Sequence, residues 1–204
     1  MNFVTEGGVY MVKETAQFFR KNLLKLFLIL FGMAVLLTVV FYMIYSKNPA
    51  DAIEEIQSFK MANAGLMSEN NTISFWGLFF NNIKAGAIYI FLGFVAPLSL
   101  FIVIVLAKSL GAALVYSETQ RAIPVLQIVF LGILPHGIFE WSAVFLCIAL
   151  GLYIGTYWLR KKKLYEWRIL AKYAAIIYFS VIVPLMFIAA FVETFITTQL
   201  SNLM

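Results

Sequence analysis

Long apolar runs alternate with short polar segments along this chain. Four runs are long enough to cross a bilayer, which takes roughly 20 apolar residues: Leu26–Tyr45, Ala85–Ala107, Gly137–Leu159 and Ile169–Val192. A fifth run, Ala122–Leu134, gives only about 20 Å of helix at 1.5 Å per residue. The pattern predicts an all-α integral membrane protein, a bundle of about five transmembrane helices whose third helix is short or re-entrant.

We expect one polytopic membrane domain over residues 1–204. Its spans are placed at about residues 24–45, 84–107, 122–134, 137–159 and 169–192. The composition agrees, because 63% of the residues are hydrophobic and 12% charged, against about 45–50% and about 25% in soluble domains. A soluble enzyme, a nucleic-acid binder and a disordered chain are therefore excluded.

The basic residues predict how the chain is oriented in the cell membrane. Lysines and arginines before the first span put the N-terminus in the cytoplasm, because cytoplasmic segments are enriched in Lys and Arg. An odd number of crossings then keeps the basic loop 160–168 cytoplasmic and places the C-terminus outside. The same reasoning assigns Lys108 and Arg121 to the cytoplasmic side. The net charge of +5 needs no nucleic acid to explain it.

The segment 46–80 between the first two spans is the one sizeable polar region, and we expect it outside the cell. Asn48 and Pro49 are typical of a helix start. Ile53, Ile56 and Phe59 follow at helical spacing and predict an amphipathic extracytoplasmic helix with an apolar face.

Placing polar side chains at membrane depth costs free energy, so such residues need hydrogen-bonding or charged partners. Two groups occur here: Asn81, Asn82 and Lys84 at the start of the second span, and His136 with Glu140, which share one helical face. The predicted topology brings both groups to the outer side of the membrane. Lys84 and Glu140 could then form an ion pair. This polar cluster either binds a ligand, a proton or a partner, or fixes how the helices pack.

The same residues argue against an enzyme and against a metal. A zinc site takes three or four protein ligands, and His136 is the sole histidine of the chain. His136 and Glu140 also lack the second histidine of the H-E-x-x-H pattern. We therefore expect a protein that is not an enzyme and has no metal or cofactor.

Small and helix-breaking residues are expected to set the helix packing. Glycines let membrane helices approach closely, and prolines remove a backbone donor. We assign helix-break and packing roles to Gly86, Gly93, Pro135, Gly137, Gly151 and Gly155. Pro97 and Pro184 lie within spans and predict kinks.

The densest basic cluster follows the fourth span. It consists of Arg160, Lys161, Lys162 and Lys163, with Arg168 close behind. Such a loop is typical of a topology determinant. An anionic-lipid patch and a docking site for a cytoplasmic protein remain open.

The chain resembles the stage II sporulation protein M family. The resemblance covers about residues 70–160 and rests on Asn81-Asn82, Gly86, Gly93, Gly111 and the stretch Ile133 to Glu140, Ile-Leu-Pro-His-Gly-Ile-Phe-Glu. The family's namesake anchors peptidoglycan-degrading partners during engulfment, and other relatives accompany export and self-protection genes for circular bacteriocins. The resemblance therefore implies either a membrane scaffold or a transport-linked component.

Two functions follow as hypotheses. The first is a non-enzymatic scaffold or adaptor that recruits partner proteins through residues 46–80. The alternative is a transport- or immunity-linked component that works with an ATPase through the loop 160–168. The expected partners are membrane lipids, other membrane or envelope proteins, a cytoplasmic ATPase in the second case, and a further copy of the chain if it oligomerises.

Overall fold

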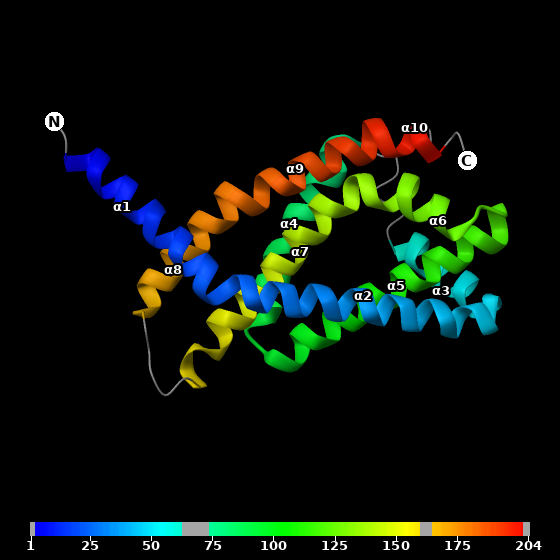
Figure 1. Ribbon diagram of the computed structural model, residues 1–204, viewed down its shortest axis with the longest axis horizontal. Coiled ribbons are helices and arrows are strands. Elements are labelled where there is room, and N and C mark those ends of the chain that lie inside the picture. The colour runs from blue at the N-terminus through cyan, green and yellow to red at the C-terminus, as the bar shows by residue number, and fades with distance from the viewer. Residues whose placement is uncertain (1–2, 63–73, 160–164, 202–204) are drawn as a thin grey trace.

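The computed structural model describes residues 3–62, 74–159 and 165–201, and these residues form helices without a strand (Figure 1). Short π or 3-10 turns, labelled η, join several of the helices. The elements are α1 (Phe3–Phe18), η1 (Phe19–Leu23), α2 (Leu24–Lys47), α3 (Pro49–Ala62), α4 (Phe75–Gly93), α5 (Ala96–Arg121), α6 (Val125–Gln127), η3 (Ile128–Ile133), α7 (Leu134–Gly155), η4 (Thr156–Leu159), α8 (Trp167–Ile177), η5 (Tyr178–Ile182), α9 (Val183–Val192), η6 (Glu193–Thr197) and α10 (Thr198–Ser201).

In the described part of the chain, five continuous helices are long and apolar enough to cross a membrane. They are Met11–Lys47, Phe75–Gly93, Ala96–Arg121, Val125–Leu159 and Trp167–Leu200. The predicted all-α membrane bundle of five spans is confirmed, but the chain divides among the spans differently from the prediction.

The expected span 84–107 is wrong, because it contains the end of α4 and the start of α5. Val95 between them has an extended backbone, with φ −107° and ψ 105°. Pro97 lies at the start of α5, where its missing N–H costs nothing. The carbonyl of Gly93 instead accepts a hydrogen bond from the Ser99 hydroxyl at 3.3 Å. The proline therefore ends one helix and begins another, where a kink was expected.

The prediction of two separate spans at 122–134 and 137–159 is also wrong. They form one continuous helix, Val125–Leu159. Pro135 does not break it, because the preceding turn η3 has the wider π geometry, which accommodates the lost donor. Pro184 is accommodated in the same way after η5. The last span likewise extends beyond 169–192, to Trp167–Leu200.

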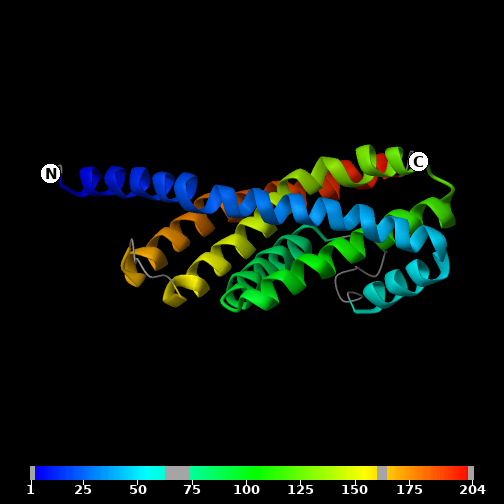
Figure 2. The ribbon, with the colours of Figure 1, turned by 60° about the horizontal axis from the view of Figure 1, so that its bottom comes forward.

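Successive long helices run in alternating directions between two ends of the bundle (Figures 1 and 2). We call these the α1 end and the α3 end. The assignment of Lys108 and Arg121 to the side of the basic loop is wrong. Lys108 forms an ion pair with Glu55 of α3, at 2.6 Å, and Arg121 closes α5 beyond it. The break at Val95 reverses the direction of this part of the chain.

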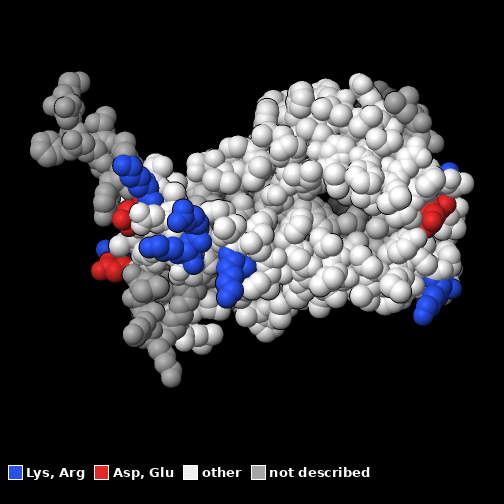
Figure 3. All heavy atoms as spheres, in the orientation of Figure 1, with Lys and Arg blue, Asp and Glu red and all other residues white. Residues whose placement is uncertain are grey.

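Charge is concentrated at the two ends of the bundle. On the face drawn in Figure 3, Lys and Arg gather over the α1 end, and a broad band between the ends carries no described charged side chain. Large apolar side chains are exposed along the helices, including Leu36, Phe91 and Leu126, which are 70%, 74% and 71% exposed. An apolar surface of this kind suits contact with lipid tails.

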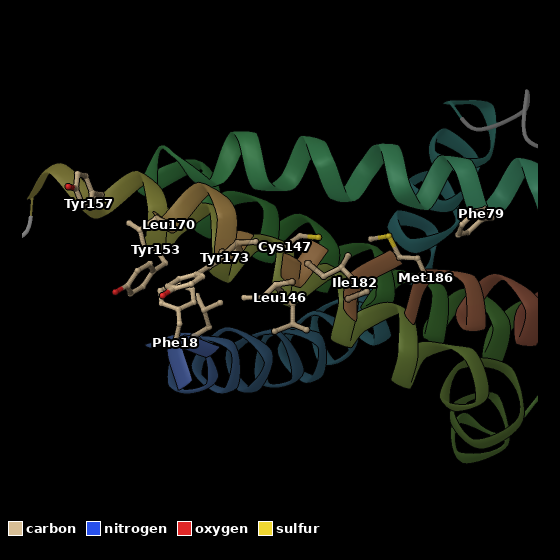
Figure 4. Packing of buried hydrophobic residues seen from close by; sticks show 14 of the residues in the cluster. Phe18, Phe79, Leu146, Cys147, Tyr153, Tyr157, Leu170, Tyr173, Ile182 and Met186 are labelled. Atoms are coloured by element: carbon tan, nitrogen blue, oxygen red, sulfur yellow. The ribbon is translucent and has the colours of Figure 1, made fainter. Parts of the chain in front are cut away.

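The largest core cluster joins α7, α8 and α9 to the N-terminal helix (Figure 4). Phe18 is fully buried there, with its ring edge-on to Tyr153 at 5.1 Å and tilted against Tyr173 at 5.2 Å. Tyr153 also donates a hydrogen bond to the side chain of Asn22. These contacts fix the α1 end of the bundle.

Glycines bring α4 and α7 into direct backbone contact. A Cβ added to Gly93 would lie 2.8 Å from the Cα of Gly151, and one added to Gly155 would overlap the backbone of Phe94. A Cβ on Gly151 would overlap the carbonyl oxygen of Ile90. The two helices run parallel, since Gly86 faces Cys147 and Gly93 faces Gly151.

The helix α3 folds back against α2 and α5 (Figure 2). Its Ala52 and Ile56 are buried with Tyr45, Ala112 and Val115. The expected amphipathic helix is therefore present, but Ile56 faces the bundle and is not available to a partner. The side chain of Phe59 lies outside the described residues.

The ion pair between Lys108 and Glu55 is expected to hold α3 in place. We predict that Glu55→Gln lowers the free energy of unfolding by about 0.2–1 kcal/mol, the range for solvent-accessible ion pairs. Chemical unfolding in detergent measures this. The neighbouring Glu54→Gln is the control, because Glu54 is exposed, and equal losses in both variants would contradict a role for the pair.

Candidate functional site

Polar side chains from two helices meet near the α3 end of the bundle. His136 and Glu140 lie four residues apart on α7, and Glu193 and Thr197 lie four apart on η6, so each pair shares a helical face. Ligand atoms of His136, Glu140 and Glu193 all lie within 4.8 Å of one another. Nδ1 of His136 is 3.2 Å from the hydroxyl of Thr197.

The surroundings of this cluster are unfavourable for two free carboxylates. His136, Glu140 and Glu193 are half-buried and Thr197 is buried. Within the described ranges, neither glutamate is in a hydrogen bond or an ion pair through its carboxylate. Like charges this close repel strongly away from water. The site therefore favours binding of something positive, either a proton or a cation.

A pocket of about 270 Å³ lies beside the cluster, between α5, η3 and η6. His136, Glu193 and Thr197 line it on one side, and Ser117 and Arg121 of α5 line it on another. The remaining lining residues are Leu110, Ala113, Ile123, Ile128, Gly132, Ile133 and Thr198. The polar groups are thus accessible to a small solute.

Asn82 of α4 is buried, with 8% of its surface exposed, and its side-chain nitrogen has no partner in the described part of the chain. Gly86, one turn further along the same face, meets Cys147 of α7 and Met186 of α9. The helical repeat therefore turns Asn82 to the side of α4 that faces α7 and α9. The register of the glycine contacts places it level with Ala143, three residues from Glu140. This polar amide was among the residues proposed from the sequence.

The other residues of the predicted polar cluster lie elsewhere. Lys84 is exposed, and it forms no ion pair with Glu140 among the described residues. It follows Asn82 by two positions, which turns it to the opposite side of α4. Asn81 is half-buried. The expected Lys84–Glu140 pair is therefore wrong.

The predicted packing residues divide into two groups. Gly86, Gly93, Gly151 and Gly155 lie where an added Cβ would collide with a neighbouring helix. Gly137 is buried, but its added Cβ would meet only Ile133 of the preceding turn, at 3.4 Å. The helix-break role given to Gly137 and to its neighbour Pro135 is wrong, because the helix continues through them.

The predicted basic loop is only partly visible. Arg160, Lys161, Lys162 and Lys163 lie outside the described residues, and Arg168 is exposed in the first turn of α8.

Glu193, Thr194 and Thr197 were missed by the sequence reasoning. Glu193 directly follows the last apolar run, and Thr197 comes four positions later. The sequence signal that could have indicated them is an acidic residue and a hydroxyl residue four positions apart at the end of a span. Their contact with His136 depends on the way α9 packs on α7.

Comparison with known proteins gives one family. A sequence model of the family described as stage II sporulation protein M matches residues 15–198. No curated protein and no solved structure matches the chain. The matched range contains every residue of the polar cluster and all the glycine contacts.

Proposed function

The chain belongs to the stage II sporulation protein M family, and we propose that it is a non-enzymatic scaffold that holds partner proteins at the cell membrane. The observation that carries the proposal is the fixed position of α3 at one end of the bundle. A scaffold needs a surface that stays in one orientation, because a preordered surface loses less entropy when it binds.

The outward face of α3 is polar and acidic. Asp51, Glu54, Gln57 and Ser58 are exposed, opposite the buried Ala52 and Ile56. The docked helix therefore presents a stable row of polar side chains next to the membrane surface. We expect a partner with a basic or hydrogen-bonding surface, since complementary charge favours encounter and register.

The distribution of basic residues supports an outward-facing α3. Arg20, Lys21 and Lys25 lie near the start of α2, and Arg168 and Lys172 lie in α8, which packs on α1. Positive charge marks the cytoplasmic side of membrane proteins. We therefore propose a cytoplasmic N-terminus, an extracytoplasmic α3 and an extracytoplasmic C-terminus.

The exposed face of α3 can be tested by charge reversal. We predict that Asp51→Lys with Glu54→Lys reduces partner capture at least fivefold, because the acidic row then repels a basic surface. Capture is measured by photo-crosslinking from position 57 in intact cells, followed by mass spectrometry. Gln199→Lys is the matched control, since Gln199 is exposed on α10.

The outcomes of this experiment separate the functions. Crosslinks to envelope proteins that vanish in the double variant support the scaffold, and unchanged crosslinks contradict it. Crosslinks to the same chain identify an oligomer contact. The transport-linked alternative, with an ATPase at residues 160–168, stays a prediction, and crosslinking from Arg168 tests it.

A further inference from the structure

We propose that His136, Glu140 and Glu193 bind a divalent transition-metal cation, with Zn²⁺ as the best match. This goes beyond the scaffold role, which does not require it. The three donor atoms lie within 4.8 Å of one another. Zinc accepts imidazole nitrogen and carboxylate oxygen at about 2.0–2.2 Å. In the proposed site the three side chains rotate to place their donor atoms at that distance from one ion.

Thr197 orients the imidazole for such an ion. Its hydroxyl lies 3.2 Å from Nδ1 of His136. When Nδ1 carries the proton and donates to the hydroxyl, the lone pair of Nε2 is free for a metal. Histidines that bind metals generally hold their second nitrogen in a hydrogen bond of this kind.

The charges of the cluster match a divalent ion. A neutral imidazole with two carboxylates carries two negative charges, which one divalent cation neutralises. The glutamates come from two different elements, α7 and η6, so the ion would also join these elements. The imidazole favours a transition metal over Mg²⁺ or Ca²⁺, which prefer oxygen ligands alone.

Two buried polar side-chain atoms on the helices around the cluster lack a hydrogen-bond partner among the described residues. They are the side-chain nitrogen of Asn82 and the hydroxyl of Thr194. Buried polar groups are rarely left unpaired, and exceptions often mark sites for ions or ordered water. Thr194 adjoins Glu193 in sequence, and Asn82 lies on the side of α4 that packs on α7 and α9. The amide nitrogen of Asn82 is a donor, so it would bind a water molecule or a carboxylate oxygen and not the cation itself.

Zinc titration of the full chain tests the proposal. The protein is purified with a tag that lacks histidine, stripped with a chelator, and titrated in detergent against a fluorescent zinc indicator. We expect one Zn²⁺ per chain in the wild type. Glu193→Gln and His136→Ala should weaken binding at least tenfold, and Thr197→Val should weaken it less. Glu166→Gln, at an exposed position just before α8, should bind as the wild type does.

A second measurement guards against variants that simply misfold. Zn²⁺ should raise the thermal unfolding midpoint of the wild type, but not that of Glu193→Gln or the near-isosteric Glu140→Gln. The proposal is overturned if the wild type shows no saturable binding. Equal affinity in the wild type and both glutamine variants also overturns it. Equal affinity for Mg²⁺ would overturn the preference for a transition metal.

Discussion

Replacing Gly151 with alanine is expected to destabilise the folded protein by about 2–3 kcal/mol. The new Cβ would overlap the carbonyl oxygen of Ile90 and lie 2.9 Å from the Cα of Gly93. Both atoms belong to the backbone of α4, so the two helices must separate. Overpacking of this kind costs about 1–3 kcal/mol, and small residues are what allow close approach of membrane helices. Unfolding with sodium dodecyl sulfate in mixed micelles measures the loss.

Gly32 provides the matched control for this substitution. It lies in α2, and a Cβ added there would meet nothing within 4 Å. Gly32→Ala should therefore be neutral or stabilising by up to about 1 kcal/mol, because alanine favours the helix. Equal effects of the two substitutions would show that α4 and α7 do not make this contact.

Replacing Phe18 with alanine is expected to cost about 3 kcal/mol. Its ring is fully buried between Tyr153, Tyr165 and Tyr173. Removing a buried aromatic ring leaves a cavity, and such changes cost about 3–5 kcal/mol in protein cores. The same unfolding titration measures this loss. Protease access to the N-terminal helix should also increase, because Phe18 joins that helix to α7 and α8.

Phe91 serves as the control for the loss of a phenyl ring. It lies on α4 with 74% of its surface exposed. Phe91→Ala should change the free energy of unfolding by less than about 0.5 kcal/mol, as is usual for surface positions. A loss as large as that of Phe18→Ala would mean that ring area alone, rather than burial, sets the effect.

The number of spans could be predicted from the sequence, but their boundaries could not. Apolar length fixes how much chain can lie in a bilayer. The run Ala85–Ala107 contains a helix break, but its one proline, Pro97, is equally compatible with a kink inside a single span. Two expected helices on either side of Pro135 are instead one. One expected span is two helices and two expected spans are one helix, so the predicted total of five is unchanged.

The two prolines show why local sequence was insufficient. Pro97 ends a helix, and the Ser99 hydroxyl supplies the donor that the Gly93 carbonyl would otherwise lack. Pro135 lies within a continuous helix because the preceding π turn adjusts to it. The same residue type gives opposite results, and the surrounding packing decides between them.

Only part of the candidate site could be predicted from the sequence. His136 and Glu140 share a face because they lie four apart on a helix, which is a local rule. Asn82 was recognised as a polar residue at membrane depth. Glu193 and Thr197 reach the site only through the packing of the last helix on α7, and no periodicity in the sequence encodes that contact. Lys84 lies two positions after Asn82 and therefore on the other side of α4, away from Glu140.

The long N-terminal helix has a mechanical consequence. Met11–Lys47 is continuous over 37 residues, about 55 Å at 1.5 Å per residue, which exceeds the roughly 30 Å hydrocarbon layer. Asn48 alone separates it from α3. A pull on α3 would therefore reach the α1 end of the bundle along one continuous helix, in parallel with the contacts that α3 makes with α5.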